Sequence, residues 1–186
     1  MPCWDHAKDS RLAVLFSLHP CLGRQVYLEY LCRIMKKMKI IYVCHGNICR
    51  SPMGEYILKK LVRDAGVEDR FEISSAAVSD EEWGNPIYPP AQATLRAHGI
   101  PFGKHSAHKI SPAEFADADL VLIMDESNRR LLRYIVGDDR SGKVHMLMEY
   151  AGLSRSVADP WYTGDFETAF DDIYSASEAL LSGFKL

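Results

Sequence analysis

The sequence predicts an α/β protein with three layers, in which helices cover both faces of a four-stranded parallel sheet. Short, wholly apolar runs rich in β-branched residues alternate with longer segments of helical periodicity. Such alternation is typical of a parallel sheet whose strands are joined by right-handed crossovers. The chain has 186 residues, of which 47% are apolar, enough for one domain with a buried core.

Four strands and four helices are expected from Lys39 onward, and residues 25–36 could form a further short helix. The predicted strands are residues 40–43, 71–77, 120–124 and 143–147. The predicted helices are residues 51–65, 90–98, 126–136 and 166–184. Ser51 followed by Pro52 has the pattern of an N-cap before a proline at the first helical position. Residues 148–164 are expected to form a long loop.

Residues 1–37 differ from the rest and are expected to form an N-terminal extension, with the functional domain at 38–186. Asp5 and Asp9 precede the apolar part of this extension, unlike the basic start of an export signal. The cysteines gather early in the chain, and none follows Cys49. A disulfide-stabilised secreted protein would distribute them more widely, so we expect a reducing, cytoplasmic compartment.

Composition argues against several functions. The formal net charge of -3 disfavours a general nucleic-acid binder, which usually has a basic surplus. No stretch approaches 18 consecutive apolar residues, so no membrane-spanning helix is expected. Cys44, His45 and Cys49 lack a fourth ligand at zinc-site spacing, so neither a metal nor a cofactor is expected. The Walker A and dinucleotide-binding glycine patterns are also absent from the sequence.

The segment after the first strand has the composition of an anion site. A helix N-terminus presents unpaired N–H groups and a partial positive charge. Gly46 and Asn47 tolerate positive φ, so the loop before the helix can turn further N–H groups inward. Arg50 adds a planar fork suited to two phosphate oxygens. The sequence therefore predicts a phosphate site between strand and helix.

The same surroundings make Cys44 a candidate nucleophile. A helix N-terminus and a guanidinium stabilise a thiolate, and a thiolate beneath a phosphate can displace its ester oxygen through a cysteinyl-phosphate. Ser51 can donate a hydrogen bond to the sulfur, which also improves it as a leaving group. Asp159, stiffened by Pro160, is the candidate proton donor for the leaving alkoxide or phenoxide. An aspartate before proline is equally common in ordinary turns.

These motifs resemble those of the low-molecular-weight protein tyrosine phosphatases. The resemblance is carried by the segment VCHGNICRSP at residues 43–52 and by DPWY at residues 159–162. Shorter matches stand in the same order: SAA at 75–77, GNP at 84–86, HGIP at 98–101 and MDESN at 124–128. The resemblance extends from Met38 to about Lys185. It implies a flavodoxin-like architecture and phosphotyrosine-containing proteins as substrates.

The resemblance also implies catalytic roles. Cys44 would be the nucleophile, Arg50 the phosphate clamp, and Asp159 the acid of the first step and the base of the second. The phosphate-binding loop would comprise His45, Gly46, Asn47, Ile48, Cys49 and Ser51 around these groups.

Further residues of the resemblance would support this loop. Asn47 would hold its strained shape through a network with Ser75 and His105. Cys49 would form a reversible disulfide with Cys44 under oxidation and so protect the nucleophile.

The pocket walls of the resembled family are apolar and aromatic, and the expected wall here comprises Ile48, Glu81, Trp83, Trp161 and Tyr162. Glu81 is a departure, because the family often has an aromatic residue there, and Trp83 is expected to substitute for it. Glu81 lies within an acidic run at residues 80–82. We therefore expect an acidic rim that favours substrates with basic flanks.

Three alternatives remain open at this stage. Arginine phosphatases of the same fold resemble this loop but have threonine where Ile48 stands. An arsenate reductase of this fold would need cysteines after Cys49, which the sequence lacks. A phosphoprotein-binding module without catalysis would be expected to lack either the thiol or the acid.

Overall fold

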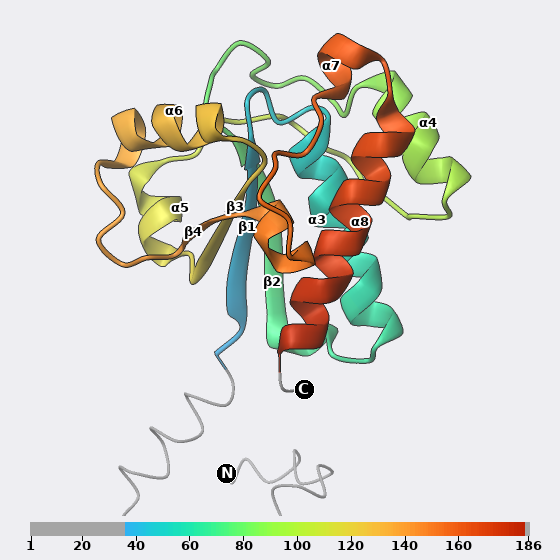
Figure 1. Cartoon of the computed structure of the whole chain (residues 1–186), viewed down its shortest axis with the longest axis horizontal. Helices are drawn as coiled ribbons and strands as arrows, with labels where there is room; N and C mark the ends of the chain where they lie inside the picture. Colours follow the sequence, from blue (N-terminus) through green and yellow to red (C-terminus); the bar gives the residue numbers. More distant parts are fainter. Residues whose placement is uncertain (1–35, 185–186) are drawn as a thin grey trace, which may run out of the picture. The chain divides into compact units, whose positions relative to one another are not determined.

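The computed structural model describes residues 36–184 (Figure 1). The expected extension at residues 1–37 therefore lies, apart from Lys36 and Lys37, outside the described residues. The compact unit that contains the described fold begins at Lys37.

The described residues contain one sheet whose strands are all parallel. The strands are β1 (Met38–Cys44), β2 (Phe71–Ala77), β3 (Leu120–Ile123) and β4 (Val144–Met146). They lie in the order β2-β1-β3-β4. The predicted four-stranded parallel α/β sheet is confirmed, with β1 and β3 at its centre.

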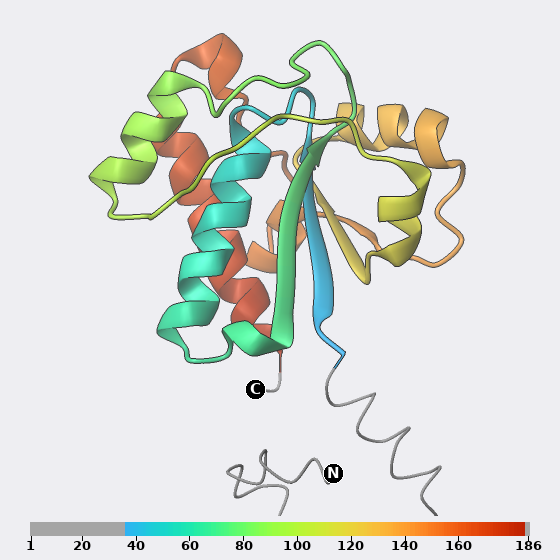
Figure 2. The same ribbon diagram turned by 180° about the vertical axis from the view of Figure 1, so that it is seen from behind.

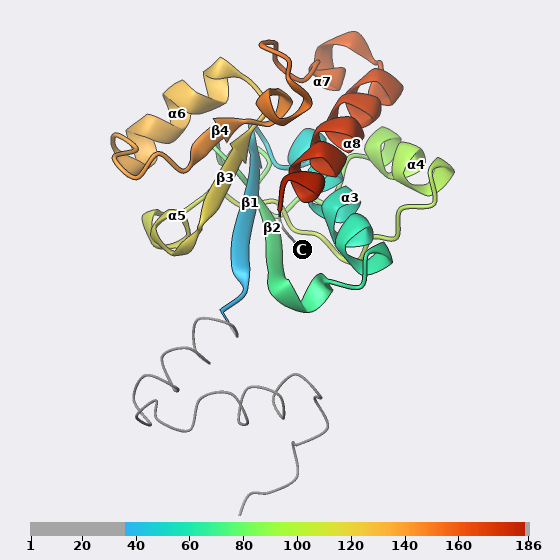
Figure 3. The same ribbon diagram turned by 60° about the horizontal axis from the view of Figure 1, so that its bottom comes forward.

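Helices cover both faces of the sheet (Figures 2 and 3). They are α3 (Arg50–Asp64), α4 (Pro89–Ala97), α5 (Pro112–Asp117), α6 (Glu126–Val136), α7 (Pro160–Thr163) and α8 (Phe166–Gly183), with 3-10 turns η1 (Glu68–Arg70) and η2 (Leu147–Ala151). Helices α3, α4 and α8 lie on one face, and α5 and α6 lie on the other. None of the helices in the described part of the chain is long and apolar enough to cross a membrane.

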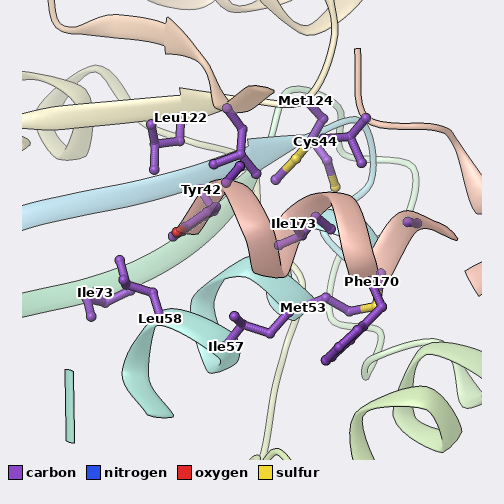
Figure 4. Close-up of a cluster of buried hydrophobic side chains, with 14 of the residues drawn as sticks. Tyr42, Cys44, Met53, Ile57, Leu58, Ile73, Leu122, Met124, Phe170 and Ile173 are labelled. Carbon is purple, nitrogen blue, oxygen red and sulfur yellow. The ribbon is translucent and has the colours of Figure 1, made fainter. Parts of the chain in front are cut away.

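Both faces of strand β1 are buried, and this fixes the register of the strand in the sheet. Its alternate residues Ile40, Tyr42 and Cys44 belong to the core shared with α3 and α8 (Figure 4). Ile41 and Val43 belong to the core on the opposite face, beneath α5 and α6. Because side chains alternate along a strand, this pattern fixes the register of β1 and the position of Cys44 at its carboxyl end.

The topology opens a crevice next to Cys44. The chain leaves β1 through α3 on one face of the sheet, whereas it leaves β3 through α6 on the other face. Neighbouring strands whose connections diverge in this way create a crevice at their carboxyl ends, where α/β proteins bind ligands. Cys44 ends β1 at this crevice, and Asp125 follows β3 there.

Two local predictions are wrong. Ser51 does not cap α3: the helix begins at Arg50, and Ser51 directs its hydroxyl to Cys44 and to the Ala76 carbonyl instead. The expected loop at 148–164 contains η2 and α7, and α5 was not predicted at all. These elements are too short for a periodic pattern, and side-chain caps hold α5 and α7, including a capping box of Ser111 with Glu114.

Gly54→Ala tests the packing of α3 against β1. A Cβ at position 54 would lie 2.4 Å from Cδ1 of Tyr42, whose ring is fully buried. The clash outweighs the gain in helix propensity, so we expect the free energy of unfolding to fall by roughly 1–3 kcal/mol in urea denaturation. Gly183→Ala, where nothing lies within 4 Å, is the matched control and should not destabilise. Equal stability of both variants would contradict this packing.

Candidate active site

A pocket of about 140 Å³ opens at the carboxyl end of β1. It is lined by Cys44, His45, Gly46, Ile48, Cys49, Arg50, Glu81, Glu82, Asp159, Trp161 and Tyr162. The predicted nucleophile, phosphate clamp and acid therefore lie around one cavity, although residues 44 and 159 are far apart in the sequence.

Two hydrogen-bonding groups contact the Cys44 sulfur. The backbone N–H of Asn47 donates to Sγ over 3.3 Å, and the Ser51 hydroxyl lies 3.1 Å from Sγ. Ser51 Oγ accepts a hydrogen bond from Asn47 Nδ2 (2.9 Å), and its one proton lies between two acceptors, the sulfur and the Ala76 carbonyl (3.3 Å). The sulfur is therefore surrounded by polar groups of the loop and of α3.

Asn47 holds the loop in an unusual conformation. Its φ of 58° is the one positive value at a non-glycine residue among the described residues. Its carboxamide donates to Ser51 and to Ser75 (2.9 Å each) and accepts from the backbone N–H of His108 (3.3 Å). Its carbonyl lies 2.7 Å from His105 Nε2. Ser75 and His105 thus both contact Asn47, as expected.

Glu55 extends this network and was not predicted from the sequence. Its carboxylate accepts a hydrogen bond from Ser75 Oγ (2.5 Å) and is paired with Lys59 (2.5 Å). Glu55 is 8% exposed, unusual for a carboxylate. The available signal in the sequence was an acid three residues before the apolar Leu58, a spacing that places both on one side of α3.

Arg50 is 3% exposed and is held by two carboxylates. Nη1 donates to Asp125 (2.7 Å) and Nη2 to Asp159 (2.6 Å). Burial alone would lower the pKa of Arg50, but the negative charges of Cys44, Asp159 and Asp125 outweigh it and raise the pKa. Asp125, which also caps α6 through the Asn128 N–H (2.8 Å), had no predicted role. In the sequence, the indication of a role for Asp125 was its position just after the central strand β3.

Helix α7 positions Asp159. The Asp159 carboxylate accepts from the Trp161 N–H (3.1 Å) and so caps this four-residue helix. The Trp161 ring packs against the Tyr88 ring with centroids 5.2 Å apart. Tyr88 is tied to the phosphate-binding loop, because its N–H donates to the Ile48 carbonyl over 2.8 Å. The acid and the aromatic wall are therefore placed together.

Cys49 is a buried residue of the phosphate-binding loop and carries a free thiol, as does Cys44. Burial, followed by the negative charge of Cys44, raises the pKa of Cys49 to about 12. Cys49 is therefore protonated at neutral pH.

The structure places one expected wall residue elsewhere. Trp83 is 67% exposed and does not line the pocket. The turn that contains it is closed by a hydrogen bond from the Trp83 N–H to the Asp80 carbonyl (3.2 Å), and Glu82 takes the place at the pocket. Glu81 does line the pocket, where it lies 3.1 Å from His45 Nε2. Ile48, Trp161 and Tyr162 line it as expected.

A strand–loop–helix with a cysteine at one end and a buried arginine at the other is the arrangement of a cysteine-dependent phosphatase. The chain belongs to the low molecular weight phosphotyrosine protein phosphatase family, whose model matches residues 39–185.

Relatives of known name and structure agree with this assignment. A low molecular weight protein-tyrosine-phosphatase of Bacillus subtilis is 34% identical over 150 residues, 80% of this chain and 96% of that protein. Its crystal structure matches with a TM-score of 0.76, covering 79% of this chain and 94% of that chain. The human low molecular weight phosphotyrosine protein phosphatase is 36% identical over 147 residues, 76% of this chain and 92% of that protein.

A third relative differs in its substrate. The crystal structure of a Drosophila arginine phosphatase is 31% identical, covers 80% of this chain and 99% of that chain, and has a TM-score of 0.72.

Asn47→Ala tests the loop network. The substitution removes the hydrogen bonds of Asn47 with Ser51, Ser75 and His108 and leaves a strained alanine at positive φ. We expect a loss of roughly 2–4 kcal/mol in the free energy of unfolding, measured in denaturant. Asn47→Gly loses the same bonds without the strain and should be about 1 kcal/mol less destabilised. Wild-type stability in both variants would show that the network does not hold the loop.

Proposed function

We propose that this chain hydrolyses phosphotyrosine in proteins through a cysteinyl-phosphate intermediate, with residues 38–186 as the phosphatase domain. One observation supports this most directly: the Cys44 sulfur, the Arg50 guanidinium and the Asp159 carboxylate line the same pocket. The family membership and the phosphotyrosine phosphatases among the relatives agree with it.

In the first step the Cys44 thiolate attacks phosphorus. The S–P bond forms as the P–O bond to the tyrosyl oxygen breaks, and Asp159 gives its proton to the leaving phenoxide. Arg50 and the free N–H groups at the start of α3 stabilise the charge on the phosphoryl oxygens.

Asp159 has to change partners before it can act as an acid. Without substrate its carboxylate is paired with Arg50 Nη2. A bound phosphate dianion competes for Nη2 and so releases the Asp159 carboxyl toward the leaving oxygen. Asp125 keeps its hold on Nη1, so the guanidinium stays in place during this exchange.

In the second step water replaces the sulfur. Asp159, now ionised, takes a proton from water as its oxygen attacks phosphorus, and the S–P bond breaks to release phosphate and the Cys44 thiolate. The hydrogen bond from Ser51 stabilises the departing sulfur. Because the reaction needs Cys44 unoxidised, we propose a reducing, cytoplasmic location for this chain.

Asp159→Asn and Cys44→Ser test these roles in steady-state assays on aryl phosphates. Cys44→Ser should abolish turnover, because a neutral hydroxyl replaces the thiolate. Asp159→Asn should lower kcat by about 10²–10⁴-fold on a phosphotyrosine peptide, the range typical of a lost general acid. The loss should be smaller for an aryl phosphate whose phenol is strongly acidic, because that leaving group needs no proton.

The control for Asp159→Asn is Asp171→Asn, which alters an exposed carboxylate of α8. It should retain wild-type rates. A full rate for Asp159→Asn on the peptide, or an equal loss on every leaving group, would overturn the assignment of the acid.

Arginine phosphatase activity is the second candidate, favoured by the Drosophila relative. Ile48 argues against it, because a buried branched apolar side chain lines the pocket, whereas the family resemblance leads us to expect threonine at this position in an arginine phosphatase. An apolar wall suits an aryl ring better than a guanidinium, which needs hydrogen-bond acceptors.

Ile48→Thr therefore tests the choice of substrate. The ratio of kcat/KM for phosphoarginine to kcat/KM for phosphotyrosine should rise by roughly tenfold in this variant. The threonine hydroxyl can accept a hydrogen bond from a guanidinium, whereas the apolar isoleucine side chain cannot. Ile48→Val, which keeps the wall apolar, is the control and should leave the ratio unchanged. Wild-type turnover of phosphoarginine above that of phosphotyrosine would make the second candidate the better one.

A further inference from the structure

The pocket carries an excess of negative charge around a site for a phosphate dianion. Arg50 is the one lysine or arginine among its described lining residues, and both ends of its guanidinium are bound to carboxylates. Glu81, Glu82 and Asp159 line the same pocket. A substrate that brings only negative charge is therefore poorly matched to the mouth of this pocket.

The carboxylates of the turn at residues 80–82 are not equivalent. Asp80 lies 4.0 Å from Lys109, and Glu81 lies 3.1 Å from His45. Glu82 instead contacts a neutral side chain: its carboxylate accepts a hydrogen bond from Asn85 Nδ2 over 2.6 Å. Glu82 therefore has no cationic partner at salt-bridge distance among the described residues.

Glu82 is also the most firmly placed of the three. Its Cγ packs so closely on the phosphate-binding loop that a Cβ at Gly46 would lie 2.9 Å from it. The negative charge of Glu82 also acts on Cys49, which lines the same pocket, and contributes to raising the pKa of the Cys49 thiol. By contrast the Glu81 side chain is 70% exposed, and exposed pairs are strongly screened by solvent.

We propose that Glu82 is a specificity-determining residue, whose carboxylate binds a lysine or arginine side chain next to the phosphotyrosine of the substrate. The inference rests on the proposed phosphotyrosine phosphatase function and names the substrate class of that site. The turn at residues 80–84 and α7 lie at the same end of the sheet (Figures 1 and 2). The exposed rings of Trp161 and Tyr162 offer cation-binding faces at this pocket as well.

The test uses phosphotyrosine peptides that differ only in the residues flanking phosphotyrosine, which are lysine, alanine or glutamate. In wild type we expect kcat/KM to be roughly tenfold higher with lysine flanks than with glutamate flanks, and the ratio to shrink in 0.5 M salt. Glu82→Gln keeps the stem that packs on Gly46 and should lower the ratio by roughly fivefold. Glu82→Lys should reverse the preference.

Two control variants separate the effect of Glu82 from the effect of removing a negative charge elsewhere in the protein. Glu81→Gln should lower the ratio less than Glu82→Gln, because the Glu81 side chain is 70% exposed and solvent screens its charge. Glu178→Gln removes an exposed carboxylate of α8 away from the pocket and should leave the ratio at its wild-type value. An equal ratio in wild type and Glu82→Gln, or a larger effect of Glu81→Gln, would overturn the inference.

A binding measurement keeps this result distinct from the proposed function. Dissociation constants of the same peptides for Cys44→Ser should show the same preference for lysine flanks and the same loss with Glu82→Gln. If wild type turns over a small aryl phosphate but neither assay shows a flank preference, the inference fails and the function stands. If no phosphoester is turned over, the function fails, and the binding series alone decides the role of Glu82.

Discussion

The left-handed backbone of Asn47 is the constraint on which the rest of the site depends. Its carboxamide and carbonyl join the phosphate-binding loop to β2 through Ser75 and to the segment before α5 through His105 and His108. The same residue donates its N–H to the Cys44 sulfur and its side-chain amide to Ser51. One residue therefore sets the shape of the loop and the polar surroundings of the sulfur.

Burying Arg50 between two acids creates a site that is costly to disturb. A guanidinium taken out of water needs compensating charge, and Asp125 and Asp159 supply it from the ends of different elements. The two acids have different duties: Asp125 is fixed by its capping of α6, whereas Asp159 belongs to a short helix at the protein surface. Removing Asp125 would leave the guanidinium with Asp159 alone, the carboxylate that the proposed reaction uses as its acid.

The sequence was sufficient for the architecture and for the residues joined by a local motif. Strand β1 and the loop after it form one continuous segment, so spacing alone located Cys44, Arg50 and the Gly46–Asn47 turn. Asp125 and His108 reach the site from other elements, and Glu55 reaches it from further along α3; only the sheet order and side-chain contacts show what they touch. The wrong prediction for Ser51 has the same origin. Its hydroxyl could cap α3 or contact Cys44 and Ala76, and only the positions of Cys44 and Ala76 in the fold show that the second arrangement is formed.

The close approach of Glu82 to Gly46 also couples the two sides of the pocket mechanically. With no side chain at position 46, the Glu82 side chain lies close to the backbone of the phosphate-binding loop. A larger residue at position 46 would require the Glu82 side chain to move away from the loop. Sequence changes at residues 46 and 82 are therefore expected to be correlated in evolution, with bulk gained at one position matched by bulk lost at the other.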